Sequence, residues 1–428
     1  MTCDELITLL KESGADAWEL TDIKTEGWEF YFIGKKLDQN RVRDVEHMSI
    51  KVYRTLKEGK MLGTASGEID PTLSRDEAKK RITDILKDAE YVINPYYELN
   101  KPAETVENMQ EVDLAAIAKD YLETIKNIRR DDNSFINSCE VFADKCHSRF
   151  VNSEGIDVTQ IYPSSMLEVV VNARNADKEI ELYRLYTAGT CDRSALTRDI
   201  EELMRFGVDR LDAKPTPALE KTAVLFSTRD AVELYKWFVS KLSANFRYMN
   251  LSDWEIGKAI APSASGDRLT LTARAFIEGS SKNRSVDNEG APTADITLME
   301  NGVPVQYWGS RQFRYYLGID DGYIAMNFEA GGGTGTKESL CSGSYMEIVE
   351  FSDFSVDDVT GDIAGEIRLG YWHDSGKVTP VSGGSISGSL TELINEMRFS
   401  GAARHYDNYL IPELTRLEGV NITGIRTE

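Results

Sequence analysis

The stretch DITLMENGVPVQYW, residues 295–308, gives the clearest indication of local structure in the chain. Its apolar residues alternate with polar ones on both sides of the pair Asn301-Gly302, at Ile296, Leu298, Val303 and Val305. A period of two is typical of a strand with one buried face, and Asn-Gly tolerates the positive φ angles of a type I′ turn. The stretch therefore predicts a β-hairpin.

The sequence around this hairpin is rich in turns, whereas the sequence before it is not. Of the 32 glycines among the 428 residues, 23 follow residue 218. The segment 212–218, DAKPTPA, holds two prolines, and each favours an extended conformation in the residue before it. We expect a linker there. It would separate an N-terminal α/β domain, residues 1–214, from a β-rich C-terminal domain, residues 219–428.

The first half alternates helix and strand patterns. Two helices are predicted after the capping boxes Thr2 to Glu5 and Ser74 to Glu77, and two more from apolar stripes within residues 114–128 and 196–211. Strand patterns lie between these helices, at residues 47–53, 61–62, 157–172 and 180–187. The predicted class is α+β, with an N-terminal mixed sheet covered by helices, followed by a mostly β C-terminal domain.

The charge of the chain argues against direct nucleic-acid binding. The net charge is −22, with −12 in residues 1–218 and −10 in residues 219–428, so neither half carries the basic face that phosphates require. The five cysteines are odd in number and mostly far apart, which suits a reducing compartment. The acidic N-terminus does not resemble a signal peptide, and no apolar run is long enough to span a membrane. We expect a cytoplasmic protein.

The sequence offers few groups for hydrolytic chemistry. The four histidines, at positions 47, 147, 373 and 405, include no i, i+4 pair on a predicted helix, so no metal motif is recognisable. Residues 384–388, GSISG, place serine at the wrong offsets for a nucleophile elbow. Residues 331–337, GGGTGTK, lack the Gly-Lys-Ser/Thr of a phosphate loop and lead into no clear helix.

Two segments remain as candidate binding elements. Asp287-Asn288-Glu289-Gly290 places two acids and a glycine in one turn, for which a solvated turn is the alternative interpretation. The glycines 331–335 would allow another backbone or a ligand to approach closely, which would suit an extended peptide laid along a sheet edge.

The order of several short motifs resembles the TldD/PmbA family, also described as modulators of DNA gyrase. The motifs lie mainly within residues 286–388: VDNEGAP at 286–292, ITLMENGV at 296–303, YLG at 316–318, NFEAG at 327–331, TGD at 360–362, GYW at 370–372, PV at 380–381 and ISG at 386–388. In the first half, residues 52–54, 63–66 and 152–155 also fit the family pattern.

This resemblance implies a two-domain α+β protein of a family that forms dimers and includes peptidases acting on short or unfolded peptides. The active TldD type carries His-Glu-x-x-x-His on the helix after the first strand of the C-terminal domain, with a cysteine nearer the C-terminus. In this chain that helix begins TRDAVELYK, residues 228–236, without a histidine, and the last cysteine is Cys341. The metal therefore cannot be carried over, and the chain resembles the PmbA, or TldE-like, branch that lacks the ligands.

From the resemblance we expect a TldE-like subunit that contributes a cleft for extended peptides, is inactive alone and pairs with a zinc-bearing TldD-like subunit. The alternative is a non-proteolytic homodimer that binds peptides or a regulatory partner. No catalytic residue and no cofactor is expected in this chain. The residues expected at the peptide cleft are Asp287, Glu289, Gly290, Asn327, Gly331, Gly332 and Gly333.

Overall fold

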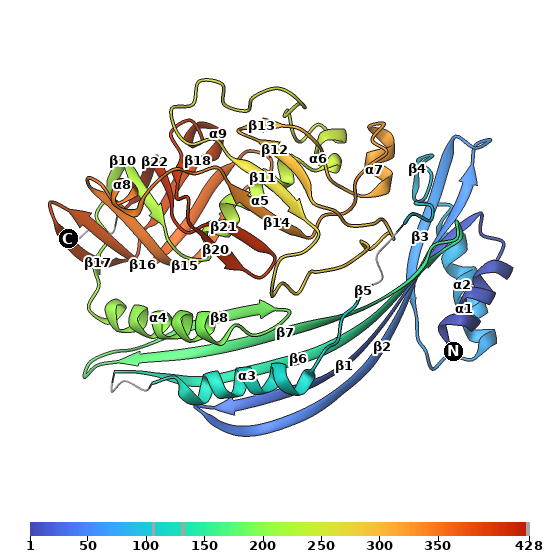
Figure 1. The fold of residues 1–428 in the computed structure, drawn as a ribbon, viewed down its shortest axis with the longest axis horizontal. Coiled ribbons are helices and arrows are strands. Elements are labelled where there is room, and N and C mark those ends of the chain that lie inside the picture. Colours follow the sequence, from blue (N-terminus) through green and yellow to red (C-terminus); the bar gives the residue numbers. More distant parts are fainter. Residues whose placement is uncertain (105–107, 130–132, 425–428) are drawn as a thin grey trace.

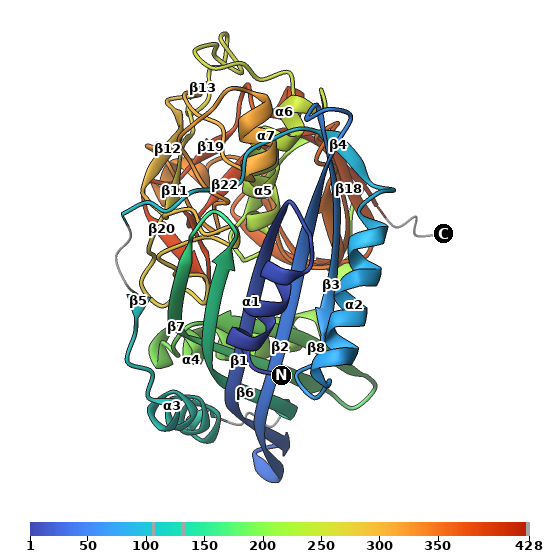
Figure 2. The ribbon, with the colours of Figure 1, turned by 90° about the vertical axis from the view of Figure 1, so that its right-hand side faces the viewer.

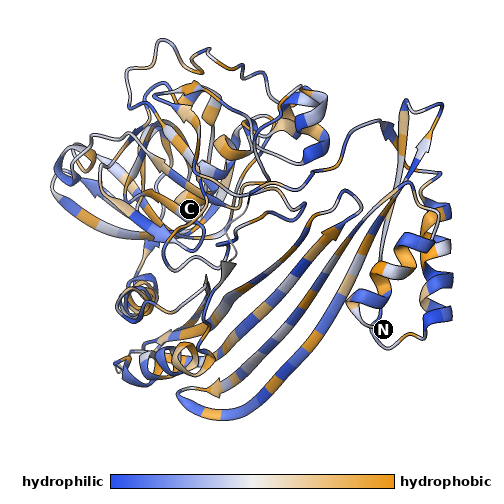
Figure 3. Cartoon of the chain, turned by 45° about the vertical axis from the view of Figure 1, so that its right-hand side comes forward, coloured by the Kyte–Doolittle hydropathy of each residue, from blue (hydrophilic) through white to orange (hydrophobic). Residues whose placement is uncertain are grey.

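The computed structural model describes residues 1–104, 108–129 and 133–424, and it confirms the predicted α+β class. A long curved antiparallel sheet with helices at its two ends forms the N-terminal part, and a compact group of strands forms the C-terminal part (Figures 1 and 2). The long strands alternate hydrophilic and hydrophobic residues along their length (Figure 3), as strands with two different faces do.

The N-terminal sheet has the order β4-β3-β2-β1-β6-β7-β5, and β8 pairs with β7. All its pairings are antiparallel except β5 with β7, so the sheet is mixed as expected. Its strands are β1 (Ala17–Ile33), β2 (Lys36–Leu56), β3 (Met61–Ile69), β4 (Ile93–Pro95), β5 (Asn108–Met109), β6 (Ser134–Asn152), β7 (Asp157–Arg174) and β8 (Glu179–Ala188).

Four helices cover this sheet, and each was predicted from the sequence: α1 (Cys3–Glu12), α2 (Arg75–Asp88), α3 (Leu114–Asn127) and α4 (Arg193–Leu211). The capping boxes at Thr2 and Ser74 are both formed, so the predicted starts of α1 and α2 are confirmed. α1 and α2 pack over one end of the sheet, and α3 and α4 over the other, in two separate apolar clusters.

The C-terminal part contains two further sheets. In the first, β15, β10, β22, β18 and β16 close into a ring because β15 also pairs with β16. The members of this sheet are β9 (Lys214–Pro215), β10 (Leu219–Phe226), β15 (Tyr345–Val356), β16 (Asp362–Asp374), β17 (Lys377–Ser382), β18 (Ser385–Ser389), β19 (Arg398–Phe399) and β22 (Thr415–Thr423). β9 lies within the expected linker and pairs with β17, so this segment is anchored rather than free.

The second C-terminal sheet has the order β13-β12-β11-β14-β21-β20. Its strands are β11 (Thr270–Arg274), β12 (Ile296–Glu300), β13 (Val303–Pro304), β14 (Asn327–Gly331), β20 (Ala403–Tyr406) and β21 (Tyr409–Pro412). The helices of this part are α5 (Ala231–Lys241), α6 (Ala244–Tyr248), α7 (Arg311–Tyr316), α8 (Lys337–Leu340) and α9 (Leu390–Leu393). α5 lies in the core between the two sheets, among buried residues of both.

The predicted hairpin at residues 295–308 is confirmed as β12 and β13. Asn301 and Gly302 join the two strands with φ of +48° and +77°, as a type I′ turn requires. The second strand is short, because it ends at Pro304, which cannot donate a backbone hydrogen bond.

Gly302→Ala is expected to lower the free energy of unfolding by about 1 kcal/mol, the cost of a left-handed backbone for an L-residue. A Cβ at Gly302 would be 3.7 Å from Arg268, an ordinary contact, so the backbone supplies the whole effect. Urea titration would measure the loss. Gly331→Ala is the matched control, because a Cβ there meets nothing within 4 Å and Gly331 has no positive φ. Equal losses in both variants would contradict the prediction.

Candidate functional site

A cavity of about 960 Å³ lies between the N-terminal and C-terminal parts of the chain. One wall comes from β8 and α4, and the opposite wall from α5, β20, β21 and the loop at Ile277–Gly279. Figure 1 shows α4 and β8 directly below β20 and β21. A space of this size, at a junction between packed layers, is typical of a ligand site.

Ion pairs line much of this cavity. Arg404 on β20 reaches across to α4, where its Nη2 lies 2.7 Å from Asp199 Oδ1 and 3.6 Å from Glu202 Oε2. Arg274 lies 2.9 Å from Asp295 and 3.2 Å from Glu329. The cavity wall therefore carries many charged side chains, and most of its arginines are paired with carboxylates. Such a wall suits a polar ligand better than an apolar one.

Helix α5 presents Val232, Glu233 and Lys236 to the cavity. Glu233 and Lys236 form an ion pair at 2.6 Å on its surface. The resemblance places the His-Glu-x-x-x-His of the active subunit on this helix, and here it supplies no imidazole. A catalytic zinc ion takes three protein ligands, and the described residues contain no group of three or more His, Cys, Asp or Glu side chains able to hold a metal. The side chains present do not fit a zinc ion.

His405 is the histidine in the cavity wall, and its Nε2 contacts the backbone oxygen of Asp407. His373 lies elsewhere, stacked on Tyr345 with ring centroids 4.2 Å apart and with its Nε2 3.3 Å from Glu347. The two histidines therefore belong to different parts of the C-terminal half.

The predicted residue Asp287 is buried, with 2% of its surface exposed, so the alternative of a solvated turn is wrong at this position. Its carboxylate accepts backbone N–H bonds from Glu289, Ala291 and Ile324 at 2.7 to 2.9 Å. Burial raises the pKa of Asp287 to about 6, although the backbone donors lower it. The buried carboxylate of Asp287 thus stabilises the turn 287–290 through hydrogen bonds to backbone N–H groups.

Glu289 and Gly290 connect this turn to the N-terminal part. The Glu289 carboxylate accepts the backbone N–H of Arg311 at 2.6 Å, and its backbone oxygen accepts from Asn100 at 3.0 Å. Gly290 has a φ of +76°, and a Cβ there would lie 2.7 Å from Phe150 of β6. The turn and the long sheet meet too closely at Gly290 to admit a side chain.

Asn327, at the start of β14, is buried and supports the loop that forms one cavity wall. Its Oδ1 accepts from Ser280 at 2.7 Å, and its Nδ2 donates to Asn283 at 3.1 Å. Asn327 itself does not reach the cavity, whereas Gly279, next to Ser280, does. Its link to the cavity is therefore indirect.

The placement of Gly331, Gly332 and Gly333 along a peptide-facing sheet edge stays a prediction. β14 lies between β11 and β21, but its pairing with β21 covers only Phe328 and Glu329, before the glycines. A Cβ at Gly332 would lie 2.6 Å from the backbone oxygen of Arg268, and one at Gly333 2.3 Å from that of Phe399. These glycines bring the segment close to other parts of its own chain.

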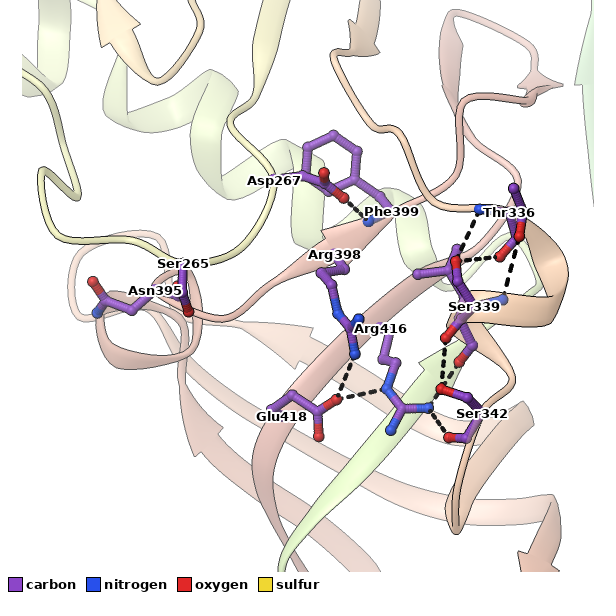
Figure 4. A network of polar contacts seen from close by, with 11 residues as sticks. Ser265, Asp267, Thr336, Ser339, Ser342, Asn395, Arg398, Phe399, Arg416 and Glu418 are labelled. Carbon is purple, nitrogen blue, oxygen red and sulfur yellow. Dashed lines mark hydrogen bonds and ion pairs between the residues drawn. The ribbon is translucent and has the colours of Figure 1, made fainter.

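The continuation of this segment is fixed by a polar network (Figure 4). Contrary to expectation, a one-turn helix, α8, follows the glycines and begins with a capping box at Thr336. Arg416 of β22 donates to the backbone oxygens of Leu340 and Ser342 at 2.8 and 3.0 Å, and its Nε contacts Glu418 at 2.6 Å. The loop is anchored to the closed sheet.

The predicted residues thus form two separate groups, in the turn 287–290 and in the segment 327–333. None of these predicted residues lines the cavity, although Glu329, within the second segment, does. Sequence reasoning missed the cavity residues Arg184, Arg229, Arg404 and Tyr406. Arg184, Arg229 and the neighbouring pair Arg404 and Tyr406 lie far apart in the sequence, and the four residues share no motif. The one local signal was the position of Arg229, between the first C-terminal strand and the following helix.

Comparison with known proteins gives a family match for the C-terminal part of the chain. Residues 219–424 match the family described as the PmbA/TldA metallopeptidase C-terminal domain. Over 414 residues the chain is 21% identical to an uncharacterized protein of Methanocaldococcus jannaschii, covering 92% of this chain and 94% of that protein.

Solved structures extend the likeness over the whole chain. The crystal structure of TldE from Thermococcus kodakarensis is similar with a TM-score of 0.78 and 17% identity, covering 98% of this chain and 99% of that one. A proposed modulator of a DNA gyrase from Thermotoga maritima is similar with a TM-score of 0.75 and 18% identity, covering 98% of each chain. At these identities the two likenesses establish a common fold.

Proposed function

The chain belongs to the PmbA/TldD family, and on that premise we propose that it is a TldE-like subunit that binds extended peptides and is inactive alone. A metal-bearing TldD-like subunit would supply the catalytic zinc. The proposal also treats residues 1–214 and 219–428 as the two domains of this subunit, with the cavity between them as the place for a peptide.

The observation that carries the proposal is the composition of α5 where it faces the cavity. Glu233 and Lys236 neutralise each other there, and the helix offers no imidazole to a metal ion. A hydrolytic zinc site needs ligands for the ion and a base for the zinc-bound water. On this helix there is no histidine to act as a ligand, and the carboxylate of Glu233 is already paired with Lys236. The cavity itself has room for several residues of a peptide.

Asp287, Glu289, Gly290 and the segment Asn327 to Gly333 keep a role in this proposal as supports of the peptide site. The turn 287–290 fixes the C-terminal part against the N-terminal sheet, and Asn327 holds the loop that forms a cavity wall. We do not assign a catalytic step to any of them.

In the test, the chain is purified alone, loaded with zinc, desalted and assayed for metal content and for peptide cleavage. We expect far less than one zinc per chain, no chelator-sensitive cleavage alone, and cleavage when a histidine-bearing family member is added. The added subunit by itself is the control. Chelator-sensitive cleavage by the chain alone would contradict the proposal, and stable homodimers that bind peptide but gain no activity would favour the non-proteolytic alternative.

With respect to membranes, none of the helices in the described part of the chain combines the length and apolar character needed to cross a bilayer.

A further inference from the structure

One arginine of the cavity wall differs from the others in its partners. Arg404 and Arg274 each contact two carboxylates, and Arg184 pairs with Glu350. Arg229 donates one N–H to the backbone oxygen of Leu185 and lies 5.8 Å from the ring centre of Tyr186. Among the described residues, no carboxylate forms an ion pair with it.

A guanidinium has five N–H donors in a planar fork that matches a carboxylate. Burial lowers the pKa of Arg229, with Arg184 acting in the same direction, yet an arginine keeps its charge in proteins. Asp230, the next residue, also lines the cavity. Burial raises its pKa while Arg184 and Arg229 lower it, so Asp230 acts on Arg229 as a nearby charge without forming an ion pair with it. Arg229 therefore faces the cavity with N–H donors that no carboxylate in the described part of the chain occupies.

Tyr406 supplies a second donor in the same wall. Its hydroxyl is shielded from solvent and finds no hydrogen-bond partner in the part of the chain that the structure describes. Burial raises the pKa of Tyr406 while the nearby charges of Arg404 and Arg229 lower it, so the hydroxyl keeps its proton near neutral pH. An unpaired buried hydroxyl is costly unless a ligand accepts from it.

We propose that Arg229 and Tyr406 form a carboxylate-binding site in the cavity, which rests on the proposed peptide-binding function and identifies the group of the peptide that is recognised. The guanidinium supplies the charge and two parallel N–H donors, and the phenol supplies a third. The carboxylate is the C-terminal group of a peptide or the side chain of an acidic residue, because both have the same chemistry.

The test uses three N-acetylated hexapeptides of alternating alanine and glycine, titrated into the full chain by calorimetry. One has a free C-terminal carboxylate, one a C-terminal amide, and one a C-terminal amide with a central glutamate. We expect at least one carboxylate-bearing peptide to bind about ten-fold more tightly than the uncharged amide, as charge-assisted hydrogen bonds do. The peptide that shows the preference identifies the source of the carboxylate.

Two variants test the residues themselves. Arg229→Gln should remove the preference, and Tyr406→Phe should reduce it several-fold without changing the charge of the cavity. Tyr406→Phe also keeps the test valid if Arg229→Gln does not fold. Arg75→Gln makes the same change at an exposed position on α2 and should leave the preference intact.

Equal binding of the three peptides, or a preference that persists in both variants, would overturn the carboxylate site and leave the peptide cavity standing. Failure of all three peptides to bind would overturn both.

Discussion

Replacing Arg314 with methionine is expected to lower the free energy of unfolding by roughly 3 kcal/mol or more, because it leaves several buried oxygens without donors. Arg314 lies on α7 with 1% of its surface exposed. Its guanidinium donates to the backbone oxygens of Gly309 and Asp320 at 3.0 and 3.1 Å, and to Asn100 of the N-terminal part at 3.4 Å. Methionine fills similar space and restores none of these bonds.

Urea titration followed by tryptophan fluorescence would measure this loss. Arg311→Met on the same helix is the matched control, because Arg311 is only partly buried and its side chain donates to the single backbone oxygen of Glu98 at 2.9 Å. We expect the control to lose about 1 kcal/mol, the usual worth of one such bond. Equal losses in the two variants would show that the buried network around Arg314 contributes no special stability.

Local patterns accounted for most of the secondary structure. The four N-terminal helices were predicted because each buries one face, and α1 and α2 also carry caps that can be recognised within four residues. The hairpin at Asn301-Gly302 was predicted because its turn depends on two neighbouring residues. In each case the interactions that fix the element lie close together in the sequence.

Contacts between distant segments could not be predicted from the sequence. A solvated turn was the alternative interpretation of Asp287 because its turn is polar, but Gly290 docks that turn on Phe150, 140 positions earlier, and Asp287 is buried. The pairing of β14 with β21 could not be predicted either, because β21 is only four residues long and lies about 80 positions later. No local sequence pattern predicts contacts between segments that lie so far apart in the chain.

Of the candidate site, the sequence predicted only that the helix α5 carries no histidine. None of the four histidines lies on α5, so the helix lacks the zinc motif that the resemblance places there. The cavity residues Arg229 and Tyr406 lie 177 positions apart in the sequence, and the folded chain brings them to one cavity. A single arginine or tyrosine has no feature in the sequence that distinguishes a buried donor from a surface residue.

Glu19 is expected to make the stability of the fold depend on pH between about 4 and 7. It lies on β1 with 8% of its surface exposed, and its carboxyl group accepts a hydrogen bond from Tyr53 at 2.7 Å. Burial raises the pKa of Glu19 to about 7, Glu289 and Asp287 act in the same direction, and Lys51 and the Tyr53 hydrogen bond act against them. Tyr97 closes this cluster by packing edge-on against Tyr53.

The direction of this pH dependence depends on whether the folded or the unfolded chain holds the Glu19 proton more tightly. The folded chain keeps the Glu19 proton up to about pH 7, whereas the unfolded chain releases it near the ordinary value of 4.5. The stabilisation is therefore complete below about pH 4 and is lost as the pH rises through 7. A difference of this size corresponds to about 3 kcal/mol, and Asp287, with its raised pKa, adds a smaller change of the same sign.

Glu19→Gln should remove most of this dependence, because the neutral amide resembles the protonated acid at every pH. Unfolding free energies of the parent chain, Glu19→Gln and the exposed control Glu300→Gln would be compared at pH 5.5 and pH 8. We expect the parent and the control to lose about 2 kcal/mol between the two values, and Glu19→Gln to lose clearly less and to be the most stable of the three at pH 8. Parallel losses in all three proteins would mean that Glu19 is ionised in the fold, and the burial of its carboxyl group would then have to be compensated by Lys51.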